Sequence, residues 1–222
     1  MFDAVILASG GSTRFSAKVN KMLVSLKARP LFLISIDKFL KIKDCGNIIL
    51  VISKEIEDNV LSVLSNLNLL EKVKVVIGGE NRQDSAYNGL QFVSSDIVLF
   101  HDAARPLTLT SDINRVYEEV KKHRAAFLAS KSTSTVKMVD GKVVTIDREH
   151  IFFSETPQGG YKKDFIKAYQ KAKKKKFNGT DDMILLEKFL KINPSPVLSR
   201  NKNIKITTIE DYQYARYLVG DK

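Results

Sequence analysis

The chain of 222 residues has little of what metal-binding or disulfide-linked proteins require: it has one cysteine, Cys45, and three histidines that lie far apart in the sequence. A single cysteine cannot form an internal disulfide, which is typical of proteins from a reducing compartment. A zinc site needs several closely spaced Cys or His residues, so the sequence excludes one. Apolar runs stay far below the roughly 18 residues of a membrane span, and no basic, apolar leader precedes the first strand. We therefore expect a cytoplasmic protein without a membrane span.

Several catalytic motifs are also absent. The sequence has no G-x-S-x-G nucleophile elbow, no G-x-G-x-x-G dinucleotide fingerprint and no G-x-x-x-x-G-K-[ST] phosphate loop. These absences argue against a serine hydrolase, a dinucleotide-binding fold and a Walker-type ATPase. No Pro-, Gly- or Ser-rich linker divides the chain, so residues 1–222 are expected to form a single domain.

Positive charge, in contrast, is abundant. The chain has 36 Lys and Arg against 25 Asp and Glu, a formal net charge of +11. Residues 162–176 alone hold eight lysines and one acid, 8 − 1 = +7 of that excess. Apolar residues recur between these lysines at helical spacing, which indicates a solvated helix face. A basic nucleic-acid-binding protein remains an alternative, although base-stacking aromatic residues are not interleaved with the lysines.

The order of elements predicts an α/β fold. Short runs rich in Val and Ile indicate strands near residues 3–8, 47–53, 73–77, 97–101, 125–130 and 203–207. Amphipathic segments between them indicate helices near residues 30–42, 55–69, 83–94, 111–123, 162–175, 181–191 and 210–219. This alternation predicts a doubly wound, mostly parallel sheet whose ligands bind beyond the carboxyl ends of its strands. Residues 136–146 differ, because Asp140-Gly141 between two β-type runs indicates a hairpin that projects as an arm over about 132–154.

Three segments that directly follow strands have the residues of a phosphate site. The first, Leu7–Phe15, is rich in Gly and Ser; Arg14 closes this loop, and a second cation, Lys21, follows seven residues later. Small residues let backbone N–H groups approach a polyanion, which the two cations can flank. In the second, Phe100–Pro106, Asp102 is placed to hold Mg²⁺ against phosphates or, alternatively, to pair with Arg105. The third is the glycine pair of Ile77–Ser85, which can bind a base or ribose or can simply be a turn.

Further along the chain, two more positions are informative. Thr180 is expected to cap the helix that follows it, and Lys205 lies in an apparent apolar strand, where a lysine requires an anionic partner. His101 is interpreted as a strand-end residue, not as a general base. Arg, Lys, backbone N–H groups and one Asp are the inventory of phosphoryl or nucleotidyl transfer.

In this order the motifs resemble the 2-C-methyl-D-erythritol 4-phosphate cytidylyltransferase family of isoprenoid biosynthesis. The resemblance covers nearly the whole chain and rests most specifically on His101–Pro106, Thr156–Gln158 and Asn203–Lys205. It implies a Rossmann-like nucleotidyltransferase fold, CTP and a polyol phosphate as substrates, Mg²⁺ as cofactor, and a homodimer joined by the β-arm. It implies neither a nucleic-acid nor a membrane partner. A ribitol 5-phosphate cytidylyltransferase is the alternative within the same chemistry.

The resemblance also implies roles for individual residues. Arg14, Lys21, Arg148 and Lys205 are expected to be catalytic. The expected nucleotide-binding positions are Ala8, Ser9, Gly10, Gly79, Glu80, Ser85 and Ala103. The expected substrate-binding positions are Asp102, Arg105, Thr135, Arg148, Thr180 and Lys205, and Asp102 is also the expected Mg²⁺ ligand. If the arm is exchanged between subunits, Thr135 and Arg148 serve the site of the partner.

The sequence departs from the family pattern at a few of these positions. Ser9 stands where the family usually has alanine, and Ser12 where it has glycine. Asn20-Lys21-Met22 replaces the usual Pro-Lys-Gln, and Glu80 replaces an aspartate. Serine is small enough to leave room for a phosphate, and the second cation is retained.

Overall fold

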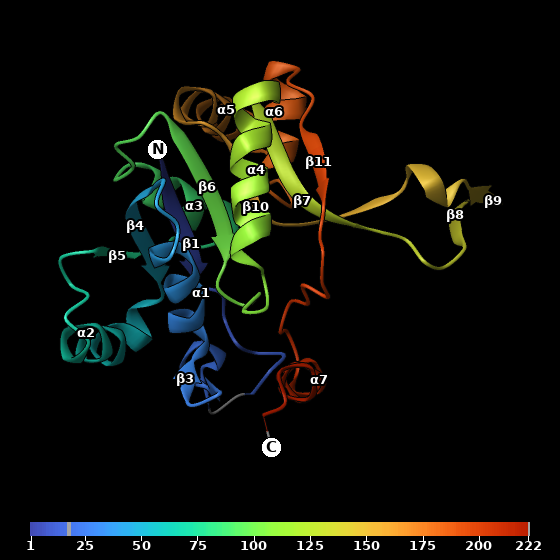
Figure 1. The fold of residues 1–222 in the computed structure, drawn as a ribbon. Coiled ribbons are helices and arrows are strands. Elements are labelled where there is room, and N and C mark those ends of the chain that lie inside the picture. Colours follow the sequence, from blue (N-terminus) through green and yellow to red (C-terminus); the bar gives the residue numbers. More distant parts are fainter. Residues whose placement is uncertain (17–18, 222) are drawn as a thin grey trace.

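A seven-stranded sheet with helices on both faces forms the body of the molecule (Figure 1). The computed structural model describes residues 1–16 and 19–221. The strand order is β11-β7-β10-β6-β1-β4-β5, and only β10 runs antiparallel to its neighbours. The expected mostly parallel α/β sheet is confirmed.

The strands of this sheet are β1 (Phe2–Ala8), β4 (Cys45–Ile52), β5 (Val73–Ile77), β6 (Ile97–Asp102), β7 (Ala125–Lys131), β10 (Phe152–Tyr161) and β11 (Ser195–Leu198). Two short strands, β2 (Ser25–Leu26) and β3 (Arg29–Pro30), pair with each other. The helices are α1 (Leu31–Leu40), α2 (Glu57–Asn66), α3 (Arg82–Leu90), α4 (Thr110–His123), α5 (Lys162–Lys174), α6 (Met183–Leu190) and α7 (Ile209–Val219).

Each face of the sheet has its own apolar core. Alternate residues of one strand point to opposite faces. In β1, Ala4 and Ile6 therefore pack with α1, α2 and α4, whereas Val5 and Leu7 pack with α3, α5 and α6. Because both faces are covered, the strands are continuous apolar runs, which is why the sequence indicates them clearly. Helix α7 packs in a smaller cluster against Leu26 and Leu31.

Two strands of the seven-stranded sheet and the short pair β2 and β3 were not predicted, and one predicted strand is wrong. Strand β10 contains Pro157, Gly159 and Gly160, which are poor strand formers, but a Cβ at Gly159 would lie 2.9 Å from Val120 of α4. Glycine thus lets helix and sheet approach closely. Strand β11 is a short edge strand that includes Pro196. The segment 203–207, predicted as a strand, is extended but outside the sheet, and its Ile206 N–H donates to the carbonyl of Ala104 at 2.8 Å.

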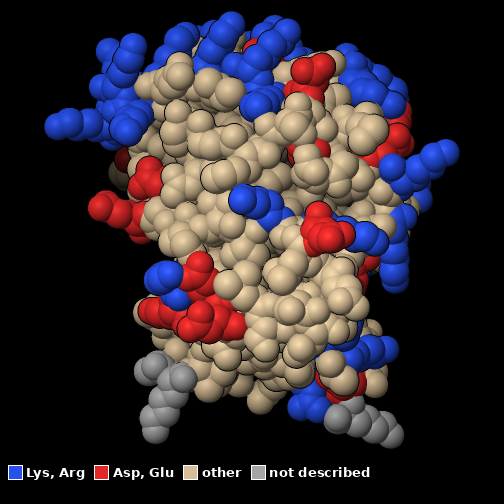
Figure 2. Space-filling model, turned by 90° about the vertical axis from the view of Figure 1, so that its left-hand side faces the viewer, with Lys and Arg blue, Asp and Glu red and all other residues tan. Residues whose placement is uncertain are grey.

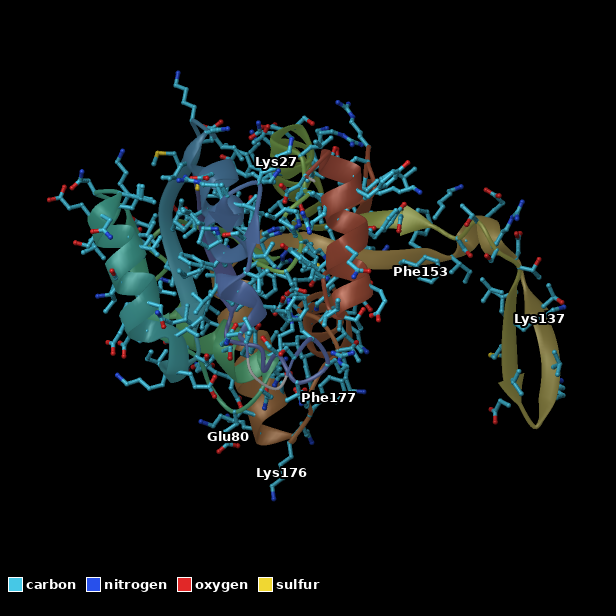
Figure 3. All side chains as sticks on the ribbon, turned by 90° about the horizontal axis from the view of Figure 1, so that it is seen from below. Lys27, Glu80, Lys137, Phe153, Lys176 and Phe177 are labelled. Carbon is cyan, nitrogen blue, oxygen red and sulfur yellow. The ribbon has the colours of Figure 1, made fainter. Side chains whose placement is uncertain are left out.

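The predicted arm is present as a hairpin of β8 (Val136–Asp140) and β9 (Lys142–Ile146). Gly141 at its turn has a φ of +68°, a conformation that favours glycine. The hairpin stands away from the body in Figure 1, where β8 and β9 are labelled, and in Figure 3, where Lys137 marks it. Its surface includes apolar side chains, since Val139 is 73% and Val143 is 67% exposed.

The lysine-rich segment forms α5 as expected. One face of the helix is buried through Phe165, Tyr169 and Ala172. The opposite face is exposed to solvent and carries Lys163, Lys167 and Lys171. Lysines and arginines crowd one end of the molecule in Figure 2, the end at which Figure 1 places α5 and α6. Of the helices described, none is both long and apolar enough to cross a membrane.

Candidate active site

A cavity of about 390 Å³ opens at the carboxyl ends of β1 and β6, where doubly wound folds bind their ligands. Four segments that are distant in the sequence form its walls: the loop after β1, the residues at the start of α3, the end of β6 and the segment that carries Lys205. Its lining residues are Leu7, Ala8, Ser9, Gly10, Gly11, Arg14, Lys21, Met22, Gly79, Glu80, Asn81, Arg82, Ser85, Asp102, Ala104 and Lys205. Ten of the fifteen predicted site residues are among them: Ala8, Ser9, Gly10, Arg14, Lys21, Gly79, Glu80, Ser85, Asp102 and Lys205.

Glycines and serines bring the first two walls into direct contact. The Ser9 hydroxyl donates to Ser85 Oγ at 2.9 Å, and Ser85 Oγ also accepts from the Gly79 N–H at 3.0 Å. A Cβ at Gly78 would lie 2.6 Å from Cβ of Ser9, so only glycine fits there. The side chain of Asn81 caps α3 by accepting from the Asp84 N–H. Ser9, a departure from the family pattern, thus links the loop after β1 to α3.

The loop that carries Lys21 is held by two further departures, Ser12 and Asn20. The Ser12 hydroxyl accepts from the Lys21 N–H at 3.0 Å and donates to Asn20 at 3.3 Å. Asn20 in turn accepts from the Met22 N–H and caps the 3₁₀ helix Lys21–Leu23. These side-chain hydrogen bonds fix Lys21 without the usual glycine and proline.

Four cations line the same cavity: Arg14, Lys21, Arg82 and Lys205. Burial lowers the pKa of Lys21, and the nearby charges of Lys205 and Arg14 lower it further. Like charges repel, so their convergence is stable only where an anion offsets it. The site therefore favours a polyanionic ligand.

Asp102 provides the main negative charge at the cavity floor. Its carboxylate contacts Lys205 Nζ at 2.6 Å and Arg82 Nε at 3.2 Å. Burial raises the pKa of Asp102, but the charges of Arg82 and Lys205 outweigh burial and hold it well below its usual range. The partners of Asp102 are thus Arg82 and Lys205, and the alternative of a simple ion pair with Arg105 is wrong.

Lys205 reaches Asp102 because Asn203 anchors its segment. Asn203 is buried; it donates to Glu155 and to the carbonyl of Thr156, and it accepts from the Thr108 hydroxyl at 2.6 Å. The predicted anionic partner of Lys205 is therefore present, although Lys205 does not lie in a strand.

His101 cannot act as a base in this cavity. It is fully buried in β6, and its Nδ1 lies 3.0 Å from the Thr156 hydroxyl, which accepts from the Asp102 N–H. The Thr156 hydroxyl thus links the His101 ring to the backbone of Asp102. Burial lowers the pKa of His101 to about 3, so the ring is neutral near pH 7.

Five predicted site residues do not line the cavity. Ala103 is buried beside it, and Arg105 donates to the Asn203 carbonyl at 2.7 Å. Thr135 and Arg148 are exposed on the arm. Thr180 is exposed, and its prediction as a helix cap is wrong, because the side chain of Asp181 accepts from the Ile184 N–H instead.

Arg82 was not predicted as a site residue. It lines the cavity and bridges Asp102 and Asp182, with its Nη2 2.8 Å from the carboxylate of Asp182. One signal in the sequence could have indicated it. A cation in the first turn of a helix is unfavourable next to the positive end of the helix dipole, so an arginine there requires an anionic partner.

The fold and the cavity together define a nucleotide-binding α/β protein of the nucleotidyltransferase class. The model of the 2-C-methyl-D-erythritol 4-phosphate cytidylyltransferase family matches residues 2–221, and the chain belongs to this family. The predicted family resemblance is confirmed.

Individual relatives agree with this assignment. The 2-C-methyl-D-erythritol 4-phosphate cytidylyltransferase of Geobacillus thermodenitrificans is 32% identical over 100% of this chain and 98% of its own. That of Caldanaerobacter subterraneus is 37% identical over 94% of both chains. The crystal structure of the 4-diphosphocytidyl-2C-methyl-D-erythritol synthase of Anaerococcus prevotii, 29% identical, covers 99% of this chain and 96% of its own with a TM-score of 0.88. These comparisons give no support to the ribitol 5-phosphate or nucleic-acid-binding alternatives.

Proposed function

We propose that this chain transfers the cytidylyl group of CTP to 2-C-methyl-D-erythritol 4-phosphate and releases pyrophosphate, a step of isoprenoid precursor biosynthesis. The observation that carries the proposal is the convergence of Arg14, Lys21 and Lys205 on one cavity beside a Gly- and Ser-rich loop. Family membership supports both substrates, because the relatives carry this activity in their names.

The proposed reaction needs little from the protein beyond positioning and charge. An oxygen of the sugar phosphate attacks the α-phosphorus of CTP in line, a new P–O bond forms, and the bond to pyrophosphate breaks. Near pH 7 a phosphate monoester is already largely ionised, since its second pKa is about 6. No general base is required, which is consistent with the buried, neutral His101. Arg14 and Lys21 stabilise the charge that develops on the transferred phosphoryl group.

The nucleotide is proposed to lie along the wall formed by the β1 loop and α3. Backbone N–H groups of Ser9 and Gly10 face the phosphates, and the start of α3 with Gly79, Glu80 and Ser85 faces the base and ribose. Lys205, at the opposite wall, is proposed to orient the sugar phosphate. Ala103 and Arg105 then support this site from beside the cavity.

Mg²⁺ is the proposed cofactor, and the residues present fit it. Among the described residues no three His, Cys, Asp or Glu side chains gather as a ready metal site. Mg²⁺ at nucleotide sites, however, takes most of its ligands from phosphates and water and needs one or two carboxylates. Asp102, ionised and at the cavity floor, would supply one. When bound, the ion would neutralise charge on the phosphates.

A homodimer is proposed to complete the site. Thr135 and Arg148 are exposed on the arm, and the arm also exposes Met138, Val139 and Val143 to solvent. Exposed apolar side chains on a two-stranded ribbon favour an interface with another subunit. We propose that each arm contributes Thr135 and Arg148 to the cavity of the partner, and that the enzyme acts in the cytoplasm, where CTP is made.

Pyrophosphate release tests the proposed function. The wild-type chain is incubated with CTP, Mg²⁺ and either 2-C-methyl-D-erythritol 4-phosphate or ribitol 5-phosphate, and ATP, GTP and UTP replace CTP as controls. Release is expected with CTP and the methylerythritol substrate. Release with ribitol 5-phosphate alone would correct the substrate, and no release with either polyol phosphate would overturn the proposal.

A further inference from the structure

Four side chains of alternating charge cross the floor of the cavity. Asp182 contacts Arg82 Nη2 at 2.8 Å, and Arg82 Nε contacts Asp102 at 3.2 Å. Lys205 Nζ contacts the other oxygen of Asp102 at 2.6 Å. This charge chain, Asp182–Arg82–Asp102–Lys205, runs from the start of α6 to the segment before α7. It connects the nucleotide wall to the proposed sugar-phosphate wall.

The two cations of the charge chain are held very differently. The Arg82 side chain bridges two carboxylates and is 28% exposed. Its anchor, Asp182, is 1% exposed, accepts from the Tyr169 hydroxyl at 2.5 Å and donates its N–H to Gln158. The Lys205 side chain is 42% exposed, and among the described residues it pairs with one carboxylate, that of Asp102. Arg82 is therefore fixed, whereas Lys205 is free to change partner.

This difference matters because the proposed reaction needs Lys205 at the phosphate of the second substrate and not at Asp102. To orient the sugar phosphate, Lys205 must leave the carboxylate of Asp102 or share its charge. The side chain of Asp102 is 10% exposed, and a buried carboxylate without a cation is strongly destabilised. Until Mg²⁺ binds, the release of Lys205 is thus favourable only if a second side-chain cation stays on Asp102, and Arg82 is the one in contact with it.

We propose that Arg82, anchored by Asp182, is a positioning residue that balances the charge of Asp102 and so allows Lys205 to move to the phosphate of the second substrate. Arginine suits this position because its planar guanidinium can hold two carboxylates at once, which the single ammonium of lysine cannot do with the same geometry. This inference rests on the proposed function and assigns Arg82 a role toward the sugar phosphate, although Arg82 stands on the nucleotide wall.

A double variant, Arg82→Met with Asp182→Asn, tests the role. It removes the Arg82–Asp182 ion pair as a unit, so Asp182 is not left as an unpaired buried charge. Lys205 is then the remaining cation on Asp102 and is held more tightly. We expect the KM for the sugar phosphate to rise by about tenfold or more, the effect of strengthening one charged contact, while the KM for CTP changes by less than about twofold. Arg82→Lys is expected to give a smaller rise of the KM for the sugar phosphate.

A matched control is available where the end of α4 meets the start of α5. Arg124 holds Asp164 through two contacts of 2.9 Å, and Asp164 is 2% exposed. Arg124→Met with Asp164→Asn removes a comparable ion pair that does not line the cavity. It is expected to lower the melting temperature without changing either KM. An equal rise of both KM values in the Arg82 variant, or a rise for CTP alone, would mean that Arg82 contacts the nucleotide and would overturn the proposal.

A second readout separates this inference from the proposed function. If the wild-type chain releases no pyrophosphate, the proposed function fails, but the binding of inorganic phosphate can still be measured by ³¹P NMR. Lys205→Met provides the reference in which the phosphate contact is lost. A dissociation constant for phosphate about tenfold higher in the Arg82→Met Asp182→Asn variant supports the role of Arg82. The same dissociation constant in wild type and variant would overturn it.

Discussion

Two buried aspartates at opposite ends of the sheet illustrate how the same side chain can serve stability or function. Asp3, at the start of β1, is fully buried and accepts from the backbone N–H groups of Asn47, Ser94 and Ser95 at 2.9, 2.6 and 3.0 Å. Asp102, at the end of β6, is 7% exposed and contacts Arg82 and Lys205 beside a cavity. One carboxylate is held by fixed, neutral donors, and the other by two cations, of which Lys205 can change partner.

The electrostatics of the two aspartates differ in the same way. Burial raises the pKa of both carboxyl groups. At Asp3 the backbone hydrogen bonds outweigh burial, whereas at Asp102 the charges of Arg82 and Lys205 outweigh it. Backbone donors cannot leave, but a lysine can turn toward a ligand. The amino end of the sheet is therefore specialised for stability and the carboxyl end for binding, which leads to four predictions.

The largest effect is expected for Lys21, at the carboxyl end. Lys21→Ala should lower kcat by about 10²–10³, as the loss of a donor to the developing charge does. The melting temperature should not fall, because removing one of three converging cations relieves repulsion from Arg14 and Lys205. Steady-state pyrophosphate release and thermal melting measure the two quantities. Near-normal turnover would refute the role of Lys21.

Asp102→Asn is expected to have the next largest effect. Asparagine keeps the shape but weakens the proposed Mg²⁺ ligand, and the half-saturating Mg²⁺ concentration should rise by about tenfold or more. Arg82 keeps its contact with Asp182, but Lys205 and Lys21 lose the nearby negative charge, so the melting temperature should fall. Calorimetric titration of Mg²⁺ with CTP present provides a measurement independent of turnover. Unchanged Mg²⁺ binding would exclude Asp102 as a ligand.

A smaller effect is expected on the arm. Arg148→Ala should lower kcat/KM by about tenfold, because one positioning contact is lost. Arg148 is exposed, and its Nη1 donates to the Thr133 carbonyl at 3.0 Å. Mixing this variant with Lys21→Ala after unfolding and refolding tests the exchanged arm. If each arm serves the partner, half of the random dimers contain one intact site, and about a quarter of wild-type activity returns. Activity no higher than the average of the two variants would show that each arm serves its own body.

The fold was predictable from the sequence where one physical signal dominated. Buried parallel strands such as β1 and β4 are unbroken apolar runs, and helices such as α5 show clear apolar periodicity. Strand β10 was missed because Pro157 and Gly159 are present for packing, against their strand propensity. The segment 203–207 shows the opposite case: its sequence is strand-like, but Asn203 fixes it by side-chain hydrogen bonds outside the sheet.

The cavity was predictable to a similar degree. Residues on the loops after β1, β5 and β6 were found because strand ends meet at one edge of a parallel sheet. Arg82 was missed because its function depends on Asp182, 100 residues away, and sequence spacing carries no information about that contact. How Ser12 and Asn20 replace the usual glycine and proline also became clear only from their hydrogen bonds to the Lys21 loop.

The smallest effect on turnover, and the clearest effect on stability, is expected for Asp3→Asn. An asparagine amide cannot accept from all three backbone N–H groups, and leaving one buried donor unpaired costs about 1–3 kcal/mol. Since the pKa of Asp3 is lowered in the folded state, its contribution is complete above the unfolded pKa of about 3.9 and is lost as pH falls through the folded value. Denaturant unfolding at pH 7 should therefore separate wild type from variant, and this difference should shrink as the pH falls below about 4. Turnover well below the melting temperature should stay unchanged. A variant that loses turnover while fully folded would show that the two ends of the sheet are coupled and that Asp3 also supports the cavity.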